Sequence, residues 1–179
     1  MMEEYLMKQA APTLAGVKCG CLFRISLDPD AITKETSRMN SVLNHRGVRI
    51  IVLRSSGREH LIYAFRPQML SDILSDGRIF SFLENRGYDM ASLGRTLRSL
   101  RERMMHYGMA HEIGIFLGYP LDDVIGFIEN KGMNFKATGC WKVYGDVSRA
   151  KSMFEKIRSC RAAYTEQYMR GTPISNVVV

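Results

Sequence analysis

A carboxylate, an ammonium and a phenol stand at the two ends of one segment of the chain, residues 111–146. The segment opens HEIGIFLGYP and closes GCWKVYGD, and each end reads as a short strand next to turn residues. Side chains alternate across a strand, so Glu112 is expected on one face, and Lys142 with Tyr144 on one face of the partner strand. If the two faces coincide, these groups form a set suited to acid–base catalysis or anion binding. We therefore predict Glu112, Lys142 and Tyr144 as catalytic residues.

Two glycines on the Glu112 face, Gly114 and Gly118, would let a ligand approach the backbone closely. With His111 at the start of the strand and Tyr119 in the turn after it, they form the predicted ligand-binding set. The alternative is structural: Glu112 and Lys142 form a cross-strand ion pair, a common way to stabilise a sheet.

The common metal and nucleotide motifs are absent. The HEIGI run has isoleucine, not histidine, at position 115, so it is not a helical zinc motif. The Cys19-Gly20-Cys21 pair has no second pair to complete a zinc site. The acidic residues Asp122 and Asp123 begin a helix and would repel a phosphate at its N-terminus. No metal site is predicted, and no cofactor can be identified. The remaining histidines, His45, His60 and His106, are expected to be satisfied or solvated.

The elements that must position these residues are predicted from periodicity, caps and turns. We expect helices over 29–47, 67–77, 79–87, 90–107 and 147–169, and a further helix directly after Pro120. We also expect a hairpin of 48–53 with 60–65, and strands over 112–118 and 140–144. Residues 1–27 are expected to be irregular or partly helical, and 171–179 a loose tail. The segment 112–145 would be a strand–helix–strand unit with a right-handed crossover.

The predicted fold class is α+β: one domain over 1–179, with a small mixed sheet of about four strands covered by helices. Hydrophobic residues make up 46% of the 179 residues and charged residues 24%, as in ordinary globular proteins. No apolar run is long enough for a membrane span, and we expect no secretory signal, because the first five residues, MMEEY, lack a basic region followed by an apolar one. A cytoplasmic location without a membrane partner is expected.

The net charge of +7 favours acidic partners. Basic residues gather on two predicted helices: Arg95, Arg98, Arg101 and Arg103 on one, and Lys151, Lys156, Arg158 and Arg161 on the other. They could contact nucleic acid, or they could be solvated faces with glutamates interspersed.

The run HEIGIFLGYPLDDVIGFIENKG, then GCWKVYGD, then a helix with Ala150 and Phe154 resembles the domain-of-unknown-function family 3793. The early APTLAGVK stretch resembles the N-terminal signature of the same family. The resemblance implies a bacterial protein associated with anaerobes and with iron or flavodoxin systems. It implies no particular activity, cofactor or catalytic residue.

Three functions stay open from the sequence. The first is a small-molecule-binding protein or enzyme, with an anionic ligand on the 112–118/140–144 face. The second is a basic accessory protein that binds nucleic acid. The third is a partner-binding adaptor in iron or redox metabolism.

Overall fold

A three-stranded antiparallel sheet forms the centre of the molecule. The computed structural model describes residues 2–106, 108 and 110–179. The sheet contains β1 (Gly20–Ser26), β2 (Arg49–Ser56) and β3 (Glu59–Phe65), in the order β1-β3-β2. The hairpin β2–β3 was predicted. Strand β1 was not predicted. Residues 1–27 were expected to be irregular or partly helical, which is confirmed by helices over 2–9 and 11–14 but is wrong for residues 20–26.

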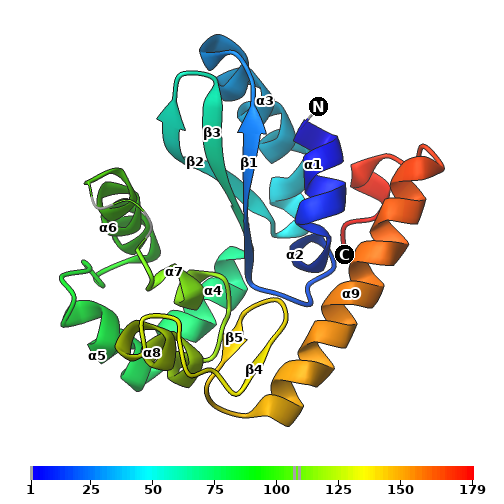
Figure 1. Cartoon of the computed structure of the whole chain (residues 1–179). Coiled ribbons are helices and arrows are strands. Elements are labelled where there is room, and N and C mark those ends of the chain that lie inside the picture. The colour runs from blue at the N-terminus through cyan, green and yellow to red at the C-terminus, as the bar shows by residue number, and fades with distance from the viewer. Residues whose placement is uncertain (1, 107, 109) are drawn as a thin grey trace.

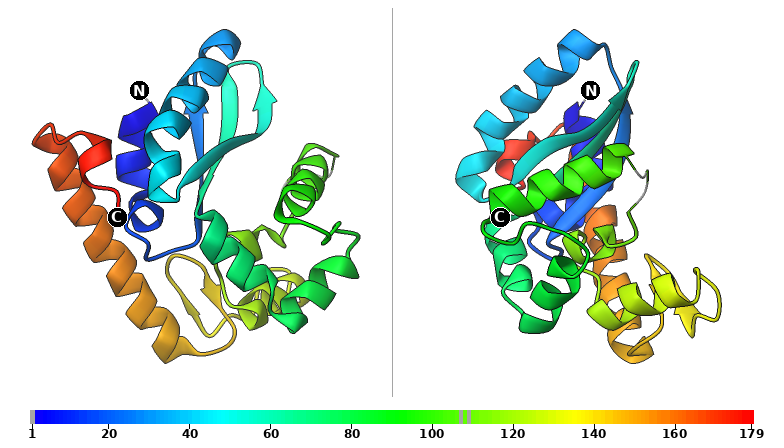
Figure 2. Two further views of the ribbon diagram at one scale, coloured as in Figure 1. Left: turned by 180° about the vertical axis from the view of Figure 1, so that it is seen from behind. Right: turned by 90° about the vertical axis from the view of Figure 1, so that its left-hand side faces the viewer.

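Helices cover both faces of the sheet (Figures 1 and 2). One face packs on α1 (Met2–Gln9), α2 (Ala11–Leu14), α3 (Pro29–Leu43) and the C-terminal half of α9 (Val147–Met169). The other face packs on α4 (Pro67–Leu74), α5 (Gly77–Glu84), α6 (Leu93–His106), α7 (Ile113–Phe116) and α8 (Leu121–Glu129). Alternation in β1 explains the two cores, because Phe23 faces the first and Leu22 the second.

A second, small sheet lies beside α9. Strands β4 (Ala137–Thr138) and β5 (Lys142–Val143) form a short antiparallel hairpin. Val143 packs on Ala150 and Phe154 of α9 in a separate core. Helix α9 therefore runs the length of the molecule, from this hairpin to the first core (Figure 1).

The α+β class is confirmed, but the predicted strand–helix–strand unit is wrong. Residues 113–116 form a short helix, α7, in place of the first strand. All four are buried, and a short apolar run buried on every side gives no periodicity that separates helix from strand. The second predicted strand is half of the hairpin β4–β5. The described strands pair only antiparallel, so the sheet is not mixed.

The prediction of a loose tail over 171–179 is also wrong. This segment contains the 3-10 turn η2 (Ile174–Asn176), and Ile174 and Val178 are buried in the first core. Tyr164 donates from its hydroxyl to the Val177 carbonyl at 2.6 Å, and Arg66 donates to the Val179 carbonyl. These contacts hold the tail against the body of the domain.

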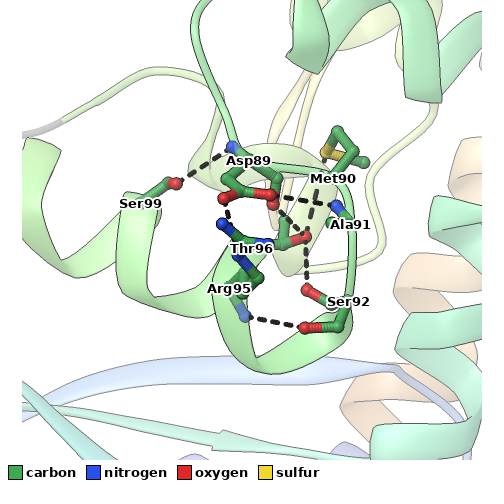
Figure 3. A network of polar contacts seen from close by, with 7 residues as sticks. All are labelled: Asp89, Met90, Ala91, Ser92, Arg95, Thr96 and Ser99. Atoms are coloured by element: carbon green, nitrogen blue, oxygen red, sulfur yellow. Dashed lines mark hydrogen bonds and ion pairs between the residues drawn. The ribbon is translucent and has the colours of Figure 1, made fainter.

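Helix boundaries follow capping chemistry more closely than apolar spacing. Gly77 was expected to close α4, but Asp76 caps α5, accepting from the amides of Arg78 and Ile79. Helix α6 begins at Leu93, three residues after the predicted start, because Ser92 accepts from the Arg95 amide at 3.3 Å (Figure 3). The predicted end of this helix, Tyr107, lies outside the described residues. By contrast, α9 has the predicted bounds.

Candidate functional site

A pocket of about 290 Å³ lies between α7, α8 and the turn that joins β4 to β5. Figure 1 shows these elements side by side in the lower half of the molecule. The residues that line the pocket are His111, Ile113, Gly114, Tyr119, Asp123, Val124, Phe127, Cys140, Trp141 and Lys142. Most are apolar or aromatic, as in sites that bind small molecules.

Helix α8 supplies one wall. Pro120 precedes its first turn, and Asp123, Val124 and Phe127 fall on one side at helical spacing. Helix α7 approaches α8 closely because Gly114 has no side chain. A Cβ at Gly114 would lie 2.7 Å from Val124 Cγ2 and 3.1 Å from Tyr119 Cδ2. Gly114 is therefore required for the packing of α7 on α8. The sequence had predicted a glycine on a strand face that lets a ligand approach the backbone, which is a different role.

The Asp123 carboxylate fixes the opposite wall. This residue is only 3% exposed. Its Oδ2 accepts from Trp141 Nε1 at 2.7 Å, and its Oδ1 accepts from the amides of Tyr144 and Gly145, each at 2.7 Å. Three donors on the hairpin thus converge on one carboxylate of α8. Charge-assisted bonds of this kind are the strong ones, so Asp123 sets where Trp141 lies.

Four aromatic side chains line the pocket: His111, Tyr119, Phe127 and Trp141. Tyr119 stacks on Trp141 with centroids 4.7 Å apart and planes at 25°. Trp141 meets Phe154 edge to face at 4.6 Å, and His111 lies 5.1 Å from Phe127. Burial raises the pKa of Tyr119 to about 12, so its phenol stays protonated at neutral pH.

Lys142 is the cation of the pocket wall. Its Nζ donates to the Gly132 carbonyl at 2.6 Å and lies 5.0 Å from the ring centre of Phe135 and 5.8 Å from that of Phe127. An ammonium has three donors, so two remain for a ligand.

Four of the predicted site residues line this pocket: His111, Gly114, Tyr119 and Lys142. Glu112, Gly118 and Tyr144 are not among the lining residues. Gly118 adopts a φ of +76° at the end of α7 and approaches Cys19. The Tyr144 ring covers Gly126, and its hydroxyl donates to the Met133 carbonyl at 2.8 Å.

The predicted convergence of Glu112 with Lys142 and Tyr144 is wrong. Glu112 is 7% exposed and accepts from Arg103 Nη2 at 3.1 Å, with Arg86 Nε at 3.8 Å. It ties α7 to α6 and to the turn after α5. The predicted cross-strand pair is wrong for the same reason: residues 113–116 are helical, and the partners of Glu112 are arginines.

Sequence reasoning missed Asp123, Phe127, Cys140 and Trp141 as pocket residues. An aspartate in a first helical turn is ordinary, and nothing in the sequence separates Asp123 from its exposed neighbour Asp122. The apolar spacing of Val124 and Phe127 was a usable signal, since it gives α8 one continuous face.

The cysteine pair does not form a chelating site. Cys19 packs in the second core and Cys21 in the first. Cys19 Sγ donates to the Phe116 carbonyl at 3.3 Å, and burial raises the pKa of the Cys19 thiol to about 12. Burial also raises the pKa of Cys21. Across residues 2–106, 108 and 110–179, no group of three or more histidine, cysteine, aspartate or glutamate side chains is placed to hold a metal ion.

Within the described part of the chain, no helix has the length and apolar character to cross a membrane. Comparison with curated proteins and with solved structures finds no match. The model of one protein family matches residues 6–178, nearly the whole chain, which confirms the resemblance noted in the sequence. The chain therefore belongs to the family described as protein of unknown function DUF3793.

Proposed function

We propose that this protein binds a small molecule that has a flat apolar part and a negatively charged group. The carrying observation is the pocket itself: aromatic walls from α8 and the β4–β5 turn, held in place by three bonds to Asp123. Aromatic faces favour offset or edge contacts with a flat ligand. A volume of about 290 Å³ suits one or two fused rings.

The charges at the wall support an anionic group on the ligand. Lys142 has donors left for a ligand, while both Asp123 oxygens already accept from the hairpin. The pocket therefore offers a cation without a competing free carboxylate. Binding is better supported than catalysis, because Glu112 is neutralised by two arginines away from the pocket; a catalytic role for it and for Tyr144 stays a prediction.

We also propose a cytoplasmic location in a bacterium. All four cysteines are free thiols, which suits a reducing compartment. An adaptor in iron or redox metabolism stays the alternative if the pocket takes no ligand.

A nucleic-acid-binding role has less support. Arg95 pairs with Asp89 and Arg103 with Glu112, so half of the arginines on α6 are engaged within the protein. Helices α6 and α9 lie on opposite sides of the molecule in both figures (Figures 1 and 2). Their basic residues therefore do not form one continuous surface.

The pocket contains its own reporter, because Trp141 is the one tryptophan of the chain. We would titrate the protein with cinnamate, cinnamyl alcohol and cinnamylamine, which share a flat skeleton and differ in charge. Trp141 emission and calorimetry should show saturable binding in the order cinnamate, alcohol, amine. Lys142→Met should reduce the preference for cinnamate over the alcohol by about three- to tenfold, since a half-exposed ion pair contributes about 1 kcal/mol.

Two phenylalanines give a matched control. Phe127 lines the pocket, whereas Phe135 contacts Lys142 from outside it. Phe127→Ala, and the gentler Phe127→Leu, should weaken cinnamate binding, and Phe135→Ala should leave it nearly unchanged. The proposal would be overturned if the Phe127 variants bound cinnamate with unchanged affinity, or if none of the three compounds bound.

A further inference from the structure

A second cavity adjoins the aromatic pocket and has a different chemistry. It is a groove of about 550 Å³ between the 138–140 turn and one face of α9. Its walls include Cys140, Lys151, Phe154, Glu155, Arg158 and Arg161. Cys140 also lines the aromatic pocket, so the two cavities meet at this residue.

Three cations line the groove without a partner. Lys151, Arg158 and Arg161 have no hydrogen bond and no ion pair to any carboxylate in the described part of the chain. Lys151 and Arg161 are ten residues apart on α9, which is about 15 Å along the helix. Glu155 is the one carboxylate among the described lining residues. Three cations against one carboxylate leave the described lining of the groove with an excess of positive charge.

A fourth cation lies close to the same place. The Lys18 Nζ sits 4.7 Å from the ring centre of Tyr119, which lines the aromatic pocket. Burial lowers the pKa of Lys18, and the positive charge of Arg161 lowers it further. Two like charges held near each other, one of them half-buried, cost free energy. A bound anion would offset that cost.

We propose that the groove binds the linked phosphate groups of a phosphorylated aromatic compound whose ring occupies the aromatic pocket. Phosphate is favoured because the planar guanidinium groups of Arg158 and Arg161, which line the groove, can each match a pair of phosphate oxygens. The two cavities share Cys140, and the Lys18 ammonium lies over the ring of Tyr119, which lines the aromatic pocket. The assignment of the ring rests on the proposed function of the pocket; the phosphate groove stands on its own residues.

The groove is tested with inorganic tripolyphosphate by calorimetry. Arg158→Gln with Arg161→Gln should weaken its binding by at least tenfold. The control pair, Arg149→Gln with Lys156→Gln, removes the same charge from α9 outside the groove and should change affinity by less than threefold. An equal loss in both pairs would mean attraction by net charge alone, and would refute the groove.

Adenosine triphosphate, which carries a flat ring and three phosphates, tests the connection. It should bind more tightly than tripolyphosphate, and both Phe127→Ala and the groove pair should weaken it. The joint site would be refuted if Phe127→Ala bound adenosine triphosphate with unchanged affinity. If cinnamate binds and tripolyphosphate does not, the groove is refuted and the proposed function of the aromatic pocket stands. If tripolyphosphate binds and cinnamate does not, only the aromatic pocket is refuted. Tighter binding of single-stranded RNA, lost on mutating Arg98 and Arg101 of α6, would overturn the phosphate-ester assignment.

Discussion

Replacing Asp123 should both destabilise the fold and release Trp141. Asp123→Ala removes three charge-assisted hydrogen bonds. Each bond of this kind contributes about 1.5–3 kcal/mol. Trp141 and Tyr144 are half-buried, so water can replace part of what is lost. We therefore expect Asp123→Ala to lower the free energy of unfolding by about 3–5 kcal/mol.

Asp123→Asn should have a smaller effect, because its amide oxygen can still accept from the hairpin amides. Its NH₂ group would face Trp141 Nε1, donor against donor, and the cost should be about 1.5–3 kcal/mol. Asp122→Ala is the matched control: it lies in the same helical turn, but its carboxylate is exposed and pairs only with exposed Arg78 at 2.7 Å. An exposed pair contributes about 0–1 kcal/mol.

Urea unfolding followed by circular dichroism gives the three free energies, and the emission maximum of Trp141 gives the second readout. The Asp123 variants should shift emission to longer wavelength as the indole loses its acceptor and gains water. If Asp123→Ala and Asp122→Ala agreed within about 0.5 kcal/mol, or if the emission stayed unchanged, Asp123 would not organise the pocket.

Three further predictions follow from particular contacts. Glu112→Gln should destabilise the fold by about 2–4 kcal/mol in urea unfolding, because it leaves Arg103 and Arg86 without their anion, yet should leave cinnamate affinity unchanged in the folded protein. Lys18→Met should raise the Tm and weaken tripolyphosphate binding. Folding lowers the pKa of Lys18 from 10.5, so between the folded and unfolded pKa values the unfolded chain binds more protons than the folded protein. In that pH range the stability of the wild type should increase with pH, and the stability of Lys18→Met should lack this increase. Gly114→Ala should cost about 1–3 kcal/mol through its contact with Val124, measured by thermal unfolding.

The fold was predictable where long periodic segments end in clear caps. Helix α9 has the predicted bounds because its apolar stripe runs through many turns. Strand β1 was missed although Phe23 and Ile25 alternate with Arg24 and Ser26, because this alternation covers only four residues.

The candidate site was predictable as a segment but not as a geometry. His111, Tyr119 and Lys142 do surround one pocket. The acid–base set failed because it depended on alternation along α7, a segment that is helical. The partners of Glu112 are Arg86 and Arg103, which lie outside the segment 111–146. No local sequence pattern predicts such a pairing.

We propose that a cellular small molecule occupies the aromatic pocket. Native mass spectrometry with an absorbance spectrum, on protein purified without oxygen, tests it most directly. We predict a co-purifying species of defined mass in the wild type and in Phe135→Ala, reduced or absent in Phe127→Ala. Protein without any bound species, or a species retained equally by Phe127→Ala, would contradict the claim.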